Sequence, residues 1–255
     1  MLKIRILGSG TSSGVPRIGN DWGLCDPTDS RNRRTRASVT VSTDSTRILV
    51  DTSPDMREQL LAAKISAVDA VIWTHDHADH CHGLDDLRQL YHARGAPVMA
   101  FARPATATTL RERFRYAFEG RDGYPPVADL RLLPDTLTIG DIRLSVVDQP
   151  HGTITSAGLR FDSHGKSLAY STDFNILTKA MRTLYKDLDL WVVDALRHKP
   201  HPTHPHLGEV LRWIEELEVR RAALVHMDHS MDYATLAAEL PGNIVPGHDG
   251  LELVA

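Results

Sequence analysis

One short run of residues restricts the fold of this chain more than any other feature of its sequence. Three histidines and two aspartates fall within six positions, in the order His75-Asp76-His77-Ala78-Asp79-His80. The run directly follows apolar residues 70–73, which predict a buried strand. Side chains two residues apart in extended backbone point to the same side, so His75 and His77 can reach one ion together. Asp79 and His80 follow after the chain turns and can face a second ion, so the run predicts a metal site at a strand end.

Composition supports this prediction and excludes several classes of protein. Fourteen of the 255 residues are histidine, the most common metal ligand. Two cysteines, Cys25 and Cys81, are too few for a cysteine-rich zinc site or a disulfide framework, and they favour the cytoplasm. No apolar run approaches the ~20 residues needed to cross a bilayer, so we expect no contact with a membrane. The net charge of −4 argues against a general polyanion-binding protein but leaves a local basic site open.

Strand and helix patterns are mixed along the whole chain, without a repeat or a linker. Residues rich in Val, Ile and Leu predict strands over 3–7, 38–41, 47–51, 70–74, 98–101, 142–148, 167–171, 190–194 and 222–226. Apolar residues at helical spacing predict helices after Ser53 and over 84–91, 110–118 and 207–217. We therefore expect one layered α/β sandwich domain over residues 1–255. For the less regular segment 103–135, a surface insertion, a lid and an oligomer contact all remain open.

The pattern His75-x-His77-x-Asp79-His80 resembles the signature of the metallo-β-lactamase superfamily. Further polar residues follow apolar strands in the order that this superfamily requires, namely Asp51, His151, Asp173 and His226. The resemblance implies an α/β fold, a four-layer αββα sandwich, and a centre with two divalent metal ions. In the ligand set that it implies, one ion is held by His75, His77 and His151, the other by Asp79, His80 and His226, and Asp173 bridges both. Asp51 would orient a ligand histidine from behind.

Within the superfamily, the chain is similar to the PhnP-like phosphodiesterases. The likeness is carried by segments 7–16 and 32–38, by Pro202-Thr203-His204-Pro205-His206, and by the ending 246–250. It implies a zinc- or manganese-dependent hydrolase that cleaves a small cyclic phosphate on ribose or a nucleotide, through a hydroxide between the ions. Some members carry a further structural zinc on clustered N-terminal cysteines. Only Cys25 remains here, so we predict no such zinc.

Two further sets of residues have candidate roles at the substrate. His206 lies at the start of the predicted helix 207–217, where an anionic group is favoured, and the resemblance implies that it contacts substrate phosphate or protonates the leaving oxygen. Basic side chains at Arg33, Arg34 and Arg36 form either a solvated loop or a clamp on a substrate phosphate. The remaining histidines near these motifs have no assigned role: His198, His201, His204 and His229.

Other functions remain as alternatives to a small-molecule phosphodiesterase. A tRNA 3′-processing nuclease would need a long arm, and no segment is an obvious one. A lactonase or thioesterase would use similar metals on a carbonyl carbon, and a non-catalytic metal-binding module would keep the ligands without turnover. The intact ligand set argues against a non-catalytic module, and the arginines and the PhnP-like motifs favour phosphorus over a carbonyl carbon. We expect a small cyclic phosphodiester as the substrate rather than a nucleic acid polymer. A homodimer is common among such relatives.

Overall fold

The computed structural model describes residues 1–255, and its strands form two seven-stranded sheets. The strands of the first sheet are β1 (Lys3–Gly8), β2 (Ser38–Ser42), β3 (Arg47–Val50), β4 (Ala70–Trp73), β5 (Val98–Ala102), β6 (Ala128–Leu132) and β14 (Glu252–Val254). Those of the second are β7 (Thr136–Ile139), β8 (Ile142–His151), β9 (Ile154–Ser163), β10 (Lys166–Ser171), β11 (Leu190–Asp194), β12 (Ala222–Val225) and β13 (Ile244–Pro246). The orders are β14-β1-β2-β3-β4-β5-β6 and β13-β12-β11-β10-β9-β8-β7.

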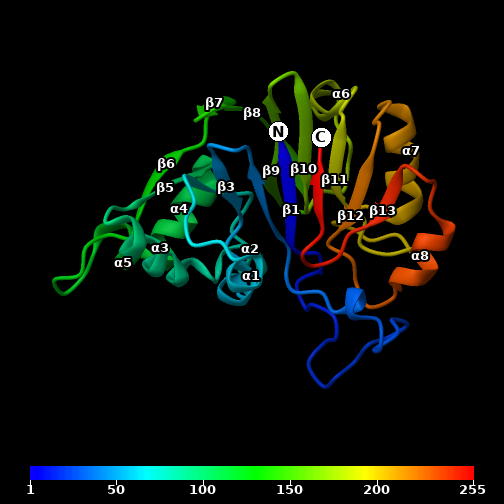
Figure 1. The fold of residues 1–255 in the computed structure, drawn as a ribbon, viewed down its shortest axis with the longest axis horizontal. Helices are drawn as coiled ribbons and strands as arrows, with labels where there is room; N and C mark the ends of the chain where they lie inside the picture. The colour runs from blue at the N-terminus through cyan, green and yellow to red at the C-terminus, as the bar shows by residue number, and fades with distance from the viewer.

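Helices cover the outer face of each sheet (Figure 1). Beside the first sheet lie α1 (Met56–Ala63), α2 (Ala78–Cys81), α3 (Leu87–Arg94), α4 (Pro104–Arg113) and α5 (Arg115–Glu119), with the short turn η2 (Leu84–Asp86). Beside the second lie α6 (Lys179–Tyr185), α7 (Leu207–Glu216) and α8 (Tyr233–Glu239), whereas η1 (Ser30–Asn32) belongs to the N-terminal loop region. None of these helices combines the length and apolarity needed to span a membrane.

Three apolar cores hold the layers together. The core between the sheets contains 24 buried residues, and each sheet packs a further 20 against its own helices. Strand β4 is apolar throughout because both of its faces are buried. Ala70 and Ile72 face the central core, while Val71 and Trp73 face the helices. The four-layer αββα sandwich is therefore confirmed.

The parallel halves of the two sheets direct their loops toward the candidate site. Strands β3 to β6 are parallel in the first sheet, and β10 to β13 are parallel in the second. The last strand β14 pairs antiparallel with β1, which places the two chain ends side by side (Figure 1). Because loops at the carboxyl ends of parallel strands leave at one edge, residues distant in sequence can meet there.

The nine predicted strands are confirmed, with end shifts of a few residues, but the sequence interpretation missed β6, β7, β9, β13 and β14. The predicted helix over 110–118 is divided at Phe114 into α4 and α5, and the helix expected after Ser53 begins at Met56. Segment 103–135 forms α4, α5 and the edge strand β6, which pairs with β5. It is thus part of the layered fold itself.

Candidate metal centre

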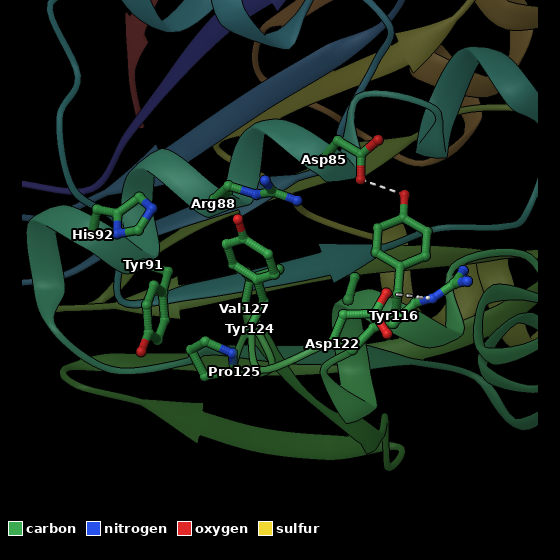
Figure 2. Close-up of a pocket in the computed structure, with 11 residues that line it drawn as sticks. Asp85, Arg88, Tyr91, His92, Tyr116, Asp122, Tyr124, Pro125 and Val127 are labelled. Carbon is green, nitrogen blue, oxygen red and sulfur yellow. Dashed lines mark hydrogen bonds and ion pairs between the residues drawn. The ribbon is translucent and has the colours of Figure 1, made fainter.

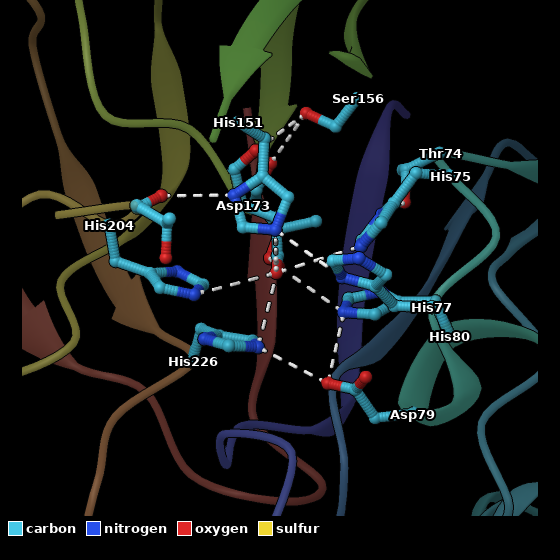
Figure 3. Close-up of polar contacts among 12 residues, drawn as sticks. Thr74, His75, His77, Asp79, His80, His151, Ser156, Asp173, His204 and His226 are labelled. Carbon is cyan, nitrogen blue, oxygen red and sulfur yellow. Dashed lines mark hydrogen bonds and ion pairs between the residues drawn. The ribbon is translucent and has the colours of Figure 1, made fainter. Parts of the chain in front are cut away.

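The ends of several strands bring the predicted ligands together in one place (Figure 3). His75 and His77 follow β4, His151 ends β8, Asp173 follows β10, and His226 follows β12. Backbone φ angles of +63°, +54° and +58° at Asp51, Asp173 and His226 lie in the left-handed region that non-glycine residues rarely adopt. Such strain is concentrated at functional sites, and here it marks the sharp turns that follow three of the strands.

The Asp173 carboxylate faces two groups of imidazoles, one with each of its oxygens. Its Oδ2 lies 3.7 Å from His75 Nε2 and 3.5 Å from His151 Nε2. Its Oδ1 lies 3.2 Å from His80 Nε2 and 3.3 Å from His226 Nε2. This arrangement places Asp173 between the two sets of side chains that the sequence assigns to separate ions.

Each set is compact enough to hold one ion. The donor atoms of His75, His77, His151 and Asp173 lie within 4.8 Å of one another, and so do those of Asp79, His80 and His226. In the second set, Asp79 Oδ2 lies 3.3 Å from His80 Nε2 and 3.5 Å from His226 Nε2. The two sets together contain every ligand that the sequence predicts.

Unpartnered nitrogen atoms show that these residues fit a metal ion. The Nε2 atoms of His75, His80 and His226 are buried and have no hydrogen-bond partner within the protein. Buried polar atoms are rarely left unpaired. Three unpaired nitrogen atoms around one carboxylate therefore indicate a binding partner from outside the protein, such as a metal ion. Imidazole and carboxylate donors suit zinc, manganese or iron.

The electrostatics of the centre favour cations. Burial alone would raise the pKa of the Asp173 carboxyl, but His226 and His80 outweigh burial and hold this pKa well below its usual range. Burial opposes a charge on His80, yet Asp173 and Asp79 raise the pKa of His80 well above its ordinary value. For His75, burial and the charge on His80 lower the pKa well below its usual value, which keeps the imidazole neutral as metal binding requires.

Asp51 contacts the candidate ligand His80 at Nδ1, the ring nitrogen opposite the one that faces Asp173. Its Oδ2 lies 2.7 Å from His80 Nδ1, and both carboxylate oxygens also accept hydrogen bonds from the backbone N–H and hydroxyl of Thr74. A carboxylate on Nδ1 holds the proton on that nitrogen and leaves Nε2 free to face the centre. The same contacts tie the end of β3 to the end of β4.

The structure places His204, rather than His206, beside the ligands. His204 Nε2 lies 3.8 Å from Asp173 Oδ2, and His204 Nδ1 lies 2.8 Å from Asp194 Oδ2. His206 instead caps helix α7 and pairs with Glu209, one turn into that helix. His204, two positions before the histidine that the sequence favoured, is thus the nearer of the two to the candidate ligands. The signal that was missed is Asp194, a buried acid at the end of an apolar strand.

Arg33, Arg34 and Arg36, for which the sequence left a solvated loop and a phosphate clamp open, do not line the cavity at the candidate ligands. A cavity of about 220 Å³ adjoins the ligands, and its lining contains no arginine; besides the ligands and His204, the lining consists of Ser12, Gly152, Thr153, Ile154 and Thr203. Arg34 is buried and donates to the backbone carbonyls of Asp228 and Met231, and Arg36 pairs with Asp55. Arg33 is exposed and stacks 5.3 Å from the Trp22 ring.

The other histidines without an assigned role have different surroundings. The His201 ring lies 5.2 Å from that of His204, which places it near the centre, whereas His198 is exposed. His229 Nε2 lies 3.6 Å from Asp21 Oδ2, on the N-terminal loop that also contains Cys25. The buried Cys25 thiol accepts a hydrogen bond from Arg34.

Comparison with known proteins agrees with this architecture. The sequence pattern of the beta-lactamase superfamily domain matches residues 46–227. A solved structure described as a new diphosphatase from the PhnP family superposes with a TM-score of 0.90 at 37% identity, covering 99% of this chain and 96% of that one. Coverage is thus nearly complete in both directions.

Two curated relatives also match. The octanoyltransferase of Porphyromonas gingivalis is 34% identical over 98% of this chain, which spans only 51% of the length of that protein. The coenzyme PQQ synthesis protein B of Xanthomonas campestris is 24% identical over 99% of both chains. This chain therefore corresponds to only about half of the octanoyltransferase. The superfamily pattern and the 37% identical structure decide the family: this chain belongs to the metallo-β-lactamase superfamily and, within it, to the PhnP family.

Proposed function

We propose that this protein is a two-metal hydrolase that cleaves a phosphodiester in a small phosphorylated molecule. The observation that carries the proposal is the Asp173 carboxylate, which presents one oxygen to each of two groups of buried imidazoles. His75, His77 and His151 would hold one ion, and Asp79, His80 and His226 the other. Zinc or manganese in such a site lowers the pKa of water and stabilises negative charge on phosphorus-bound oxygens.

The choice of phosphorus as the reacting atom is supported by the PhnP-family diphosphatase, which shares 37% of its residues with this chain. The arginines do not contribute to this choice, because none lines the cavity. A cavity of about 220 Å³ suits a compact group such as a cyclic phosphate on ribose better than a nucleic acid duplex. The cytoplasmic location, the single domain over 1–255 and a homodimer remain predictions from the sequence.

His204 has the surroundings of a proton donor to the leaving oxygen. The Asp194 carboxylate accepts a hydrogen bond from His204 Nδ1–H, which fixes the ring and keeps a proton on Nδ1. The other ring nitrogen of His204, Nε2, points toward Asp173 at the cavity. A histidine held in this way can carry a proton on Nε2 and deliver it as the ester bond breaks. We therefore assign to His204 the role that the sequence interpretation gave to His206.

The function is tested with purified protein of measured metal content and bis(p-nitrophenyl) phosphate. We expect about two metal ions per chain and hydrolysis that a chelator lowers at least about a hundredfold, with recovery on adding zinc or manganese. The ester p-nitrophenyl acetate tests the carbonyl-directed alternative. Two bound ions without hydrolysis of any phosphodiester would contradict the proposal and favour a non-catalytic binding module.

Substituting His204 is expected to slow turnover in a way that depends on the leaving group. For a 2′,3′-cyclic nucleotide, whose leaving alkoxide needs a proton, we expect His204→Gln to lower kcat about a hundredfold. The loss should be clearly smaller for bis(p-nitrophenyl) phosphate, because p-nitrophenolate leaves without protonation. Both metals should be retained. If His206→Ala shows this dependence and His204→Gln does not, the original assignment to His206 is restored.

A further inference from the structure

The cavity of about 220 Å³ beside the candidate ligands is the place where a reacting phosphate would lie. A larger pocket of about 380 Å³ is formed by α3, α5 and the loop before β6, with Tyr91, Tyr116 and Tyr124 in its lining, and it shares no residue with this cavity (Figure 2). Apart from the candidate ligands and His204, the residues that line the cavity carry no charge. Contacts to a phosphate beyond those of the metals and His204 therefore come from neutral donors.

Ser12 is the one residue of the cavity lining that belongs to the N-terminal loop, and it lies in a tight turn. The backbone N–H of Gly14 donates to the carbonyl of Thr11 at 2.8 Å, which closes a β-turn with Ser12 and Ser13 at its centre. Gly14 has a φ of +64°, a conformation that favours glycine. Neither the Ser12 hydroxyl nor the backbone N–H of Ser12 or Ser13 has an acceptor within the protein. The turn thus offers free donors at the cavity.

Backbone hydrogen bonds fix this turn to the residue that follows the candidate ligand His226. The N–H of Thr11 donates to the carbonyl of Met227 at 3.3 Å. At the other end of the turn, Val15 and Arg34 exchange two backbone hydrogen bonds of 2.9 Å each. The turn is therefore held at both ends before a substrate binds, and donors held in this way lose little freedom on binding.

The leaving group of the substrate has a different wall of the cavity. A Cβ atom on Gly152 would lie 3.1 Å from Thr203 Cγ2, so the hairpin between β8 and β9 touches the loop that carries His204. The Thr203 hydroxyl lies 3.2 Å from His201 Nδ1 and is thus already engaged. Because His204 draws the leaving oxygen to this wall, Ser12 is left to contact an oxygen that stays on phosphorus.

We propose that Ser12 is a substrate-contacting residue, and that its hydroxyl and the free N–H groups of its turn donate hydrogen bonds to a phosphorus-bound oxygen that does not leave. The inference rests on the proposed function and gives the site a phosphate contact that the arginines do not supply. Hydrogen bonds to a charged oxygen are stronger than those between neutral groups, and successive N–H groups in a turn are a common anion site. Since this oxygen is charged both in the substrate and in the transition state, the contact acts mainly on KM.

Kinetics of a Ser12 variant test this contact on bis(p-nitrophenyl) phosphate. We expect Ser12→Ala to raise KM about tenfold, with kcat changed by less than about twofold and with an unchanged metal content. Ser12→Thr keeps the hydroxyl and should keep most of the wild-type KM. Ser13→Ala is the matched control, because Ser13 lies in the same turn, donates to the Gly14 carbonyl and does not line the cavity. Thr153→Ala removes the other free hydroxyl of the cavity lining, and a rise in KM for this variant but not for Ser12→Ala would overturn the inference.

Binding of inorganic phosphate to the metal-loaded protein tests the same contact without turnover. In calorimetry we expect Ser12→Ala to bind phosphate about tenfold more weakly than the wild type, and Ser13→Ala to bind it equally well. Unchanged binding by Ser12→Ala, or a loss of metal from this variant, overturns the inference even if phosphodiesters are hydrolysed. Phosphate binding that depends on Ser12, without hydrolysis of any phosphodiester, would instead contradict the proposed function alone.

Discussion

Replacing Asp173 by alanine is expected to lower phosphodiester turnover at least about a thousandfold and to reduce the metal content of the purified protein. The reason is that one carboxylate serves both groups of imidazoles, with Oδ2 toward His75 and His151 and Oδ1 toward His80 and His226. Its loss removes a shared ligand and also the negative charge that compensates two cations. Elemental analysis and initial rates on bis(p-nitrophenyl) phosphate measure the two effects separately.

The Asp173 experiment needs a variant that stays folded and a matched control. Asp173→Asn keeps the size of the side chain and removes only its charge, so circular dichroism should show an unchanged fold for this variant. Asp44→Ala is the control, because the Asp44 side chain is 87% exposed and pairs only with the N-terminus. Full activity and full metal content in Asp173→Asn would show that the carboxylate does not bridge two ions.

The candidate ligands could be predicted from the sequence because several of them directly follow an apolar strand. Strand β4 is buried on both faces, so its sequence is a continuous apolar run, and the polar residues after it stand out. The same contrast marks Asp51 after β3 and His226 after β12. At these positions, the burial of the strand explains both the apolar sequence pattern and the place of the polar residue at the strand end.

Residues in irregular loops could not be placed in this way. Between β11 and α7, the prolines at 200, 202 and 205 exclude a helix but do not determine which histidine turns inward. Asp194 decides this, because it is buried at the end of β11 and holds His204. Similarly, a run of arginines does not show which guanidinium turns away from solvent, since the partners of Arg34 come from a loop nearly 200 residues later.

The missed strands have a related cause. Strand β6 alternates buried and exposed residues at the edge of its sheet, and β7 is mostly exposed, so neither has the apolar run of a central strand. Strand β14 is three residues long and exists because β1 offers a free edge. These elements depend on tertiary pairing more than on local preference.

Arg34 connects the N-terminal loop to the chain beyond His226, and replacing it by methionine is expected to destabilise the protein by about 3 kcal/mol. Its guanidinium is almost completely buried and donates to the carbonyls of Asp228 and Met231 and to the side chain of Asn32. Burial lowers the pKa of this guanidinium, with Cys25 acting in the opposite direction, yet arginine remains charged at neutral pH. The loss of these donors would remove the side-chain hydrogen bond to the Met231 carbonyl and would leave the Asp228 carbonyl with only the backbone N–H of Met231. Urea unfolding measures the change in free energy.

The same substitution should also weaken metal binding, because the Arg34 contacts hold the loop that directly follows the ligand His226. A supporting contact of this kind typically changes metal affinity about tenfold, which a competition titration with a chromogenic chelator can measure. Arg33→Met is the matched control: Arg33 is the exposed neighbour, and its loss should change the unfolding free energy by less than about 0.5 kcal/mol and leave KM unchanged. If Arg33→Met raised KM while Arg34→Met left stability unaltered, the assignment of the buried and exposed arginines would be reversed, and a substrate clamp at this loop would be supported.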